Sequence, residues 1–245
     1  MTETKNPFLE PYNTPHHTPP FHLIKVEHYE PAIREGMKEQ NEEIDAIVNN
    51  AEKPNFQNTI VALERSGSLL ERVTTIFGNL LSAETNDEMQ ELAEKMMPLL
   101  AEHNNSISLN EKLFARIKAV YDRKDQLTLN GEDSMLLQKT YDGFIRSGAN
   151  LQGEAKEKYR RLNTELSVLA LRFSQTLLKE TNNYELSLTT SQLEGLPESM
   201  LESYAQTAKE KGKEGNIITL DAPSFIPFMK YCKDRTPVSY THLRA

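Results

Sequence analysis

The chain has 245 residues, of which 38% are hydrophobic and 26% charged, and its 28 Lys and Arg against 36 Asp and Glu give a net charge of −8. This length can bury a sizeable core in one large domain or two small ones. The acidic balance, with no run of Lys and Arg, argues against nucleic acid or an anionic membrane as a partner, because both require a basic surface.

A single cysteine, Cys232, excludes an intrachain disulfide. We interpret it as a small buried apolar residue rather than a reactive thiol. No stretch reaches the ~20 apolar residues that a membrane span requires. The first residues contain no apolar core of a signal peptide, so the sequence predicts a cytoplasmic protein.

The chain begins with an irregular arm rich in proline, followed by helices from about Tyr29. The arm contains Pro7, Pro11, Pro15, Pro19, Pro20 and Pro31. Proline is disfavoured inside helices and central strands. Apolar side chains such as Phe8 and Tyr12 lie between the prolines. We therefore expect the arm to pack on the surface of its own protein.

Beyond the arm, apolar residues recur at steps of three, four and seven, which is the period of helices that bury one face. The predicted helices cover about 29–52, 56–82, 85–106, 110–123, 130–147 and 153–182. Thr85 and Glu88 have the spacing of a capping box at the start of the third helix. Pro98 predicts a local kink in it, and Asn130 is a predicted cap.

The helix over 153–182 has the clearest apolar pattern. Its large apolar residues follow steps of three and four: Tyr159, Leu162, Leu166, Leu169, Phe173 and Leu177. Such a seam is typical of helices that pack against other helices. We expect this helix at the centre of the bundle, with Leu162, Leu166, Leu169 and Phe173 buried.

The last part of the chain changes character. Tyr184–Leu188 alternates and Asn216–Leu220 is β-branched and apolar, so both predict short strands, with a helix between them that opens near Pro197. A final helix begins at Asp221. Because we expect the sequence to continue beyond this segment in the complete protein, we expect Phe225 and Phe228 to lack partners.

The decapeptide from Thr236 to Ala245 has neither an apolar period nor a cap. It resembles a run at the ends of metagenomic translations in which adapter DNA has been read as protein, so we exclude it from the predicted fold. The predicted fold is mainly α and truncated, an elongated multi-helix bundle. Its parts are an arm (1–27), a helical bundle (28–183), a small strand–helix–strand unit that starts an α+β segment (184–235) and an artefactual tail (236–245).

The residues that could do chemistry form no known motif. There is no His-Glu-x-x-His pair, no phosphate-binding glycine loop and no Gly-x-Ser-x-Gly elbow. The histidines are His16, His17, His22, His28, His103 and His242. His16, His17, His22 and His28 have spacings that fit no standard zinc site, so we interpret them as surface residues. We interpret acidic pairs such as Glu42-Glu43 as parts of solvated helix faces.

Several segments of the chain form a collinear series: Asn6–Leu9 through Phe21, Ile24–Ile33, Phe56–Ile60 with Ala62–Glu64, Tyr141–Ala149, Tyr159–Ser167, Leu193–Pro197 and Thr219–Ser224. These segments resemble the thimet oligopeptidase family of zinc metallopeptidases, and within it the bacterial peptidyl-dipeptidase (dipeptidyl carboxypeptidase) branch. Together they cover about 6–235.

The resemblance implies a longer, mostly helical protein with two lobes beside a channel for short peptides. In that family a zinc ion polarises the scissile carbonyl, and the Glu of a His-Glu-x-x-His helix activates water. No position of this chain matches these residues. We therefore expect no catalytic and no metal-binding residue here, leave the substrate-binding residues unassigned, and expect this chain to be inactive and free of bound zinc.

Two other classes of protein are open alternatives. The first is a stand-alone helical scaffold or protein-interaction module, which would explain the missing motifs. The second is a metal-storage or metal-sensing bundle, which would place Glu-x-x-His pairs on facing helices, and the sequence contains no such pair.

Overall fold

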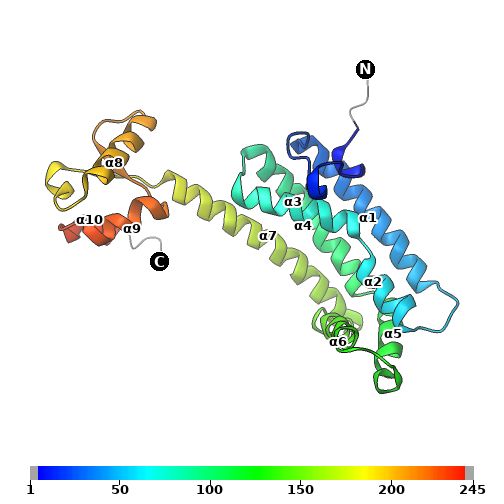
Figure 1. The fold of residues 1–245 in the computed structure, drawn as a ribbon. Coiled ribbons are helices and arrows are strands. Elements are labelled where there is room, and N and C mark those ends of the chain that lie inside the picture. Colours follow the sequence, from blue (N-terminus) through cyan, green and yellow to red (C-terminus); the bar gives the residue numbers. More distant parts are fainter. Residues whose placement is uncertain (1–4, 241–245) are drawn as a thin grey trace. The chain divides into compact units, whose positions relative to one another are not determined.

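The computed structural model describes residues 5–240, which fall into two compact units, one ending at Leu171 and the other beginning at Arg172. The fold is mainly α, as predicted, with a single two-stranded sheet among the described residues (Figure 1). None of the helices within 5–240 combines the length and the apolar character needed to cross a membrane.

The first unit consists of the arm and a set of packed helices. Its helices are α1 (Val26–Val48), α2 (Ala62–Arg65) after a π-helical turn (Phe56–Val61), α3 (Ser68–Ala83), α4 (Asp87–Ser108), α5 (Glu111–Tyr121), α6 (Gly131–Arg146) and α7 (Gly153–Asn183), which continues into the second unit.

Asparagine side chains begin three of these helices. Asn86, Asn110 and Asn130 each accept a hydrogen bond from the backbone N–H three residues ahead, at 2.8–3.0 Å. This satisfies one of the N–H groups that a helix start leaves unpaired. The predicted cap at Asn130 is confirmed. The capping box at Thr85 is wrong, because Thr85 Oγ1 instead accepts from Gln90 at 2.7 Å.

Two further expectations about helix boundaries are wrong. The helix expected over 56–82 is interrupted at Ser66-Gly67, where Ser66 is extended and Gly67 has φ 75°. Glycine adopts this left-handed conformation at little cost. Pro31, assigned to the arm, lies inside α1. It sits near the helix start, where its missing N–H removes a single hydrogen bond of the ladder.

One core joins the arm to α1, α3 and α4. Phe8 is fully buried, and its ring lies 4.9 Å from that of Tyr29, which in turn lies 5.2 Å from Phe77. Arg72 of α3 donates a hydrogen bond of 2.7 Å to the carbonyl oxygen of Phe8. The arm therefore packs into its own protein, as predicted.

A second core lies among α1, α5, α6 and the π-helical turn. Ile60, Leu113 and Ile117 are fully buried in it. Beside them the rings of Tyr121 and Tyr141 stack at 3.8 Å. The contacts between α5 and α6 fix the start of the segment Tyr141–Ala149, which carries part of the family resemblance.

The expected burial of the α7 seam is wrong. Leu162, Leu166, Leu169 and Phe173 are 49, 63, 52 and 71% exposed, and no residue of α7 is buried. The helix itself is confirmed, with bounds within one residue of those predicted. Its apolar period was interpreted correctly as helical, but the helix packs on the first unit through another face.

The second unit pairs two short strands with three helices. Strand β1 (Leu186–Leu188) is antiparallel to β2 (Asn216–Ile218), and α8 (Glu198–Glu210) connects them. Helices α9 (Ala222–Tyr231) and α10 (Arg235–Tyr240) follow, so residues 236–240 continue a helix. Phe228 is fully buried and Phe225 packs on the same cluster, so the expectation that they lack partners is wrong.

Candidate functional site

The structure does not gather the histidines of the arm into one site. His16 and His17 are exposed residues with φ of 57° and 54°, and His17 Nδ1 lies 3.0 Å from the carbonyl oxygen of Tyr12. His22 is exposed. Nowhere in 5–240 do three or more His, Cys, Asp or Glu residues stand close enough together to hold a metal ion.

The other histidines have structural partners. His28 accepts a hydrogen bond of 3.0 Å from the backbone N–H of Lys25 at the start of α1. His103 of α4 is buried, and its Nε2 donates to Oε1 of Gln40 at 2.7 Å. Burial lowers the pKa of His103 from its ordinary value, which favours the neutral ring. His242 lies outside the described residues.

Cys232 is buried in the core of the second unit. Its thiol donates to the carbonyl oxygen of Asp234 at 3.1 Å. Burial raises the pKa of this thiol, which disfavours the reactive thiolate. The structure therefore agrees with the interpretation of Cys232 as a core residue.

The acidic pair of α1 does not form a catalytic dyad. Glu42 and Glu43 are exposed, and Glu43 Oε2 accepts a hydrogen bond of 2.7 Å from the backbone N–H of Gly67. Glu43 thus holds the turn that interrupts the helix predicted over 56–82.

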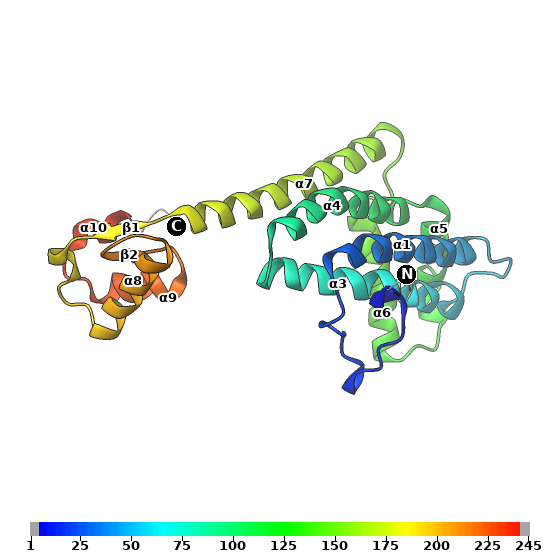
Figure 2. The same ribbon diagram turned by 90° about the horizontal axis from the view of Figure 1, so that it is seen from above.

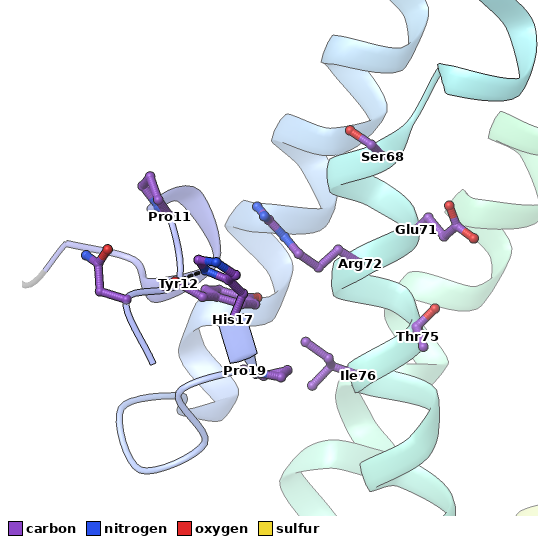
Figure 3. Close-up of a pocket in the computed structure, with 10 residues that line it drawn as sticks. Pro11, Tyr12, His17, Pro19, Ser68, Glu71, Arg72, Thr75 and Ile76 are labelled. Atoms are coloured by element: carbon purple, nitrogen blue, oxygen red, sulfur yellow. Dashed lines mark hydrogen bonds between the residues drawn. The ribbon is translucent and has the colours of Figure 1, made fainter. Parts of the chain in front are cut away.

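A cavity of about 680 Å³ lies between the arm and α3 (Figure 3). Arg72 points from α3 toward the arm, with its guanidinium carbon 4.9 Å from the centre of the Tyr12 ring. The hydroxyl of Tyr12 is buried without a hydrogen-bond partner, and burial raises its pKa. Because Arg72 also bonds the Phe8 carbonyl, this cation fastens the arm to α3.

A second cavity, of about 500 Å³, lies among α1, α2, α4, α6 and α7 and has a more polar lining. Its wall includes the hydrogen-bonding side chains Gln40, Glu64, Asn104, Asn105, Ser108, Lys139, Thr140, Ser147 and Asn163. Asn104 and Lys139 are exposed. Amide, hydroxyl and ammonium groups of this kind can bind the N–H and C=O groups of an extended peptide.

Three of the segments that carry the family resemblance meet at this polar cavity. Leu63 and Glu64 come from the segment Ala62–Glu64, and Gly143, Phe144 and Ser147 come from Tyr141–Ala149. The third segment, Tyr159–Ser167, contributes its own residues to the wall: Tyr159 and Asn163. The segments are far apart in sequence, and folding brings them to one place.

Asn105 was missed by reasoning from the sequence. It is fully buried in α4, and its Oδ1 accepts a hydrogen bond of 2.7 Å from Asn163 Nδ2. Its own Nδ2 donates to Thr164 Oγ1 at 3.3 Å. The available signal was a pair of asparagines inside a helix, Asn104-Asn105, because asparagine is a poor helix former and needs a reason to be there.

No protein-family model matches the chain. Dipeptidyl carboxypeptidase of Escherichia coli is 40% identical over 234 residues, which are 95% of this chain and 34% of that protein. Oligopeptidase A of E. coli is 29% identical over 231 residues, 94% of this chain and 33% of that protein. The thimet-like oligopeptidase of Dictyostelium discoideum is 27% identical over 212 residues, 84% of this chain and 31% of that protein.

The chain therefore spans about a third of the length of the curated relatives that it matches. The identity is higher to dipeptidyl carboxypeptidase than to oligopeptidase A. The resemblance to the thimet oligopeptidase family is confirmed: the chain aligns with part of such peptidases, at higher identity to dipeptidyl carboxypeptidase than to oligopeptidase A.

Proposed function

We propose that this chain is a non-catalytic portion of a zinc-dependent peptidase that releases C-terminal dipeptides from short peptides. The supporting observation is the 40% identity to a dipeptidyl carboxypeptidase over 95% of the chain. A stand-alone scaffold would not require identity of this extent to a peptidase. The cytoplasmic location expected from the sequence stays a prediction.

Within residues 5–240, the side chains that the structure describes do not fit the zinc ion that the family resemblance implies. His103 and Cys232 carry the side-chain types that zinc prefers. His103 is hydrogen-bonded to Gln40, and Cys232 is buried, which raises the pKa of its thiol. A zinc ligand must present a free lone pair to the metal, and thiol ligation requires the thiolate. No catalytic step is therefore assigned to this chain, and the zinc would be held by residues outside it.

The contribution of this chain would be to contact the peptide. The polar cavity is suited to this role, because it presents hydrogen-bonding groups from five helices in a volume of about 500 Å³. Lys139 adds a cationic group that can pair with the carboxylate of a peptide C-terminus, and Glu64 adds an anionic group. Both are on segments positioned by the second core.

The non-catalytic assignment is tested on the isolated chain. Zinc is measured by elemental analysis after dialysis, and hydrolysis of an N-blocked tripeptide is followed by chromatography. We expect neither stoichiometric zinc nor release of a dipeptide. Stoichiometric metal together with chelator-sensitive dipeptide release would show that the chain is itself an enzyme.

The cavity is tested in a chimera in which this chain replaces the aligned third of E. coli dipeptidyl carboxypeptidase. Asn104→Ala and Lys139→Ala should each raise KM with little change in kcat, because a contact equally strong in the ground and transition states affects binding alone. Lys112→Ala, on α5 and outside the cavity lining, is the control. Equal KM values for the cavity variants and the control would remove the cavity from the proposal.

A further inference from the structure

Helix α7 has two chemically different faces, and the polar one packs on the first unit. Half-buried residues recur along the helix at steps of one, three and four: Lys156, Tyr159, Arg160, Asn163, Thr164, Ser167, Val168 and Leu171. Figure 2 shows the first half of α7 running beside α4. Most of these inward residues before Leu171 are polar, the reverse of the usual arrangement, in which the apolar face of a helix packs inward.

Specific polar contacts fix this orientation. The buried Asn105 of α4 accepts from Asn163 at 2.7 Å and donates to Thr164 at 3.3 Å. Arg160 pairs with Glu102 of α4, and Lys156 pairs with Glu111 of α5 at 2.7 Å. Since buried polar groups are costly unless they are paired, this set of contacts holds the polar face of α7 against the unit.

The apolar face consequently points away from the first unit. Leu162, Leu166 and Leu169 are 49, 63 and 52% exposed. Leu162 and Leu166 follow Arg160 and Thr164 by two residues, which on an α-helix is a rotation of about 200°. The same helix continues into the second unit, where Phe173 is 71% and Leu177 54% exposed. A contiguous apolar face of this kind marks an interaction surface.

We propose that the apolar face formed by Leu162, Leu166 and Leu169 is the docking surface for the remaining polypeptide of the full-length peptidase. The inference rests on the proposed function. The length of the relative supports it: about two thirds of E. coli dipeptidyl carboxypeptidase lies outside the region that this chain matches, so a large polypeptide is available to cover the face. The step of three and four between the leucines suits the packing of a helix from that polypeptide.

A second copy of this chain fits the face less well. The chain carries a net charge of −8, so two copies repel each other at moderate ionic strength. Burying leucine side chains favours association in proportion to the apolar area that is removed from water. Three leucines give a modest driving force, which is more effective within one polypeptide, where association carries no cost of bringing two molecules together.

Side-chain labelling with a photoactivated carbene tests the proposal. The isolated chain and the chimera with E. coli dipeptidyl carboxypeptidase are labelled in parallel, and modification of the peptide containing Leu166 and Leu169 is compared by mass spectrometry. We expect labelling to fall severalfold in the chimera. The peptide containing Leu9, which is 46% exposed in the arm, serves as an internal reference.

Two labelling results would overturn the docking proposal. Equal labelling of the Leu166 peptide in both proteins shows that the remaining polypeptide leaves the face open. Weak labelling of the Leu166 peptide in the isolated chain shows that the face is covered without that polypeptide. Light scattering then shows whether a second copy of the chain or the monomer itself covers the face. Either labelling result, equal or weak, overturns the proposal. If the chimera does not fold, intact E. coli dipeptidyl carboxypeptidase and its aligned third are compared at the aligned positions.

A pair of variants gives an independent readout. Leu166→Gln, which is polar but keeps a helix propensity close to that of leucine, should leave the melting temperature of the isolated chain nearly unchanged and lower that of the chimera, whereas Glu165→Gln should change neither. A fall in melting temperature of equal size in both proteins, or no fall in either, contradicts docking at Leu166. Peptidase activity of the chimera is recorded separately, so a folded but inactive chimera refutes the proposed function while the labelling still reports on the docking surface.

Discussion

The side-chain amide of Asn163 in α7 donates a hydrogen bond of 2.7 Å to Oδ1 of Asn105 in α4, and Asn105 is fully buried. The pair orients α7, because an amide that is removed from water must keep its partners. Because this hydrogen-bonded pair lies on the inward face of α7, the regular apolar seam of the helix is exposed to solvent.

Replacing Asn105 should destabilise the first unit. Asn105→Ala leaves the amide of Asn163 without its acceptor and removes the bond to Thr164, at a cost of about 1–3 kcal/mol. The measurement is urea unfolding followed by circular dichroism. The neighbouring Asn104, which is exposed, is the matched control, and Asn104→Ala should change the unfolding free energy by less than about 0.5 kcal/mol. Equal effects would mean that the buried pair does not anchor α7.

The arm offers a second matched comparison, between two adjacent residues. Phe8 is fully buried against Tyr29, and Leu9 is 46% exposed. Phe8→Ala should lower the unfolding free energy by about 3–5 kcal/mol, as removal of a buried aromatic side chain does. Leu9→Ala should have little effect. Unfolding curves that coincide for the two variants would show that the arm is not part of the core.

His103 should make stability depend on pH. Burial holds the pKa of its ring below the ordinary value of 6.5, so the unfolded chain takes up the proton before the folded one. This contribution is fully present above the ordinary pKa and is lost as the pH falls through 6.5 toward the pKa of the folded state. His103→Gln keeps a side-chain donor toward Gln40 and does not titrate.

The unfolding free energies of the original chain and of His103→Gln are measured at pH 7.5 and at pH 5.5. The original chain should lose more stability than the variant between these values, so the difference between them should be smaller at pH 5.5. His22→Gln, at an exposed position, should follow the original chain at both values. A difference that does not vary with pH would contradict the burial of a neutral His103.

Cys232 reports on the second unit. Because its thiol is buried and burial raises its pKa, it should react with a maleimide or an aromatic disulfide far more slowly in the folded chain than in urea. Phe228→Ala, which removes a fully buried ring from the same core, should speed the reaction. Rapid labelling of the original chain without denaturant would show that this core is open.

The sequence predicted most helices because their apolar periods are long and their caps are local. Asn130 and the bounds of α7 are examples. The break at Gly67 was missed because the apolar period of 56–82 continues through it, and only Ser66-Gly67-Ser68 signals the turn. A periodic pattern specifies a helix but does not show where a single left-handed residue interrupts it.

The direction of the α7 seam could not be predicted from the sequence. The spacing of Leu162, Leu166 and Leu169 shows that these residues share a face, but not which neighbour covers it. The competing determinant, Asn105, comes from a helix more than 50 residues away, and its effect appears only in the folded unit. The polar cavity is similar, because the three segments around it meet only through packing.

We propose above that this chain is a non-catalytic portion of a peptidase that releases dipeptides. The most direct test of this proposal is mass spectrometry of the products formed from an N-blocked tetrapeptide by the chimera with E. coli dipeptidyl carboxypeptidase, beside the isolated chain. We expect the chimera to release the C-terminal dipeptide and the isolated chain to leave the peptide intact. A chimera that unfolds cooperatively yet releases no dipeptide, or an isolated chain that cleaves the peptide, would contradict it.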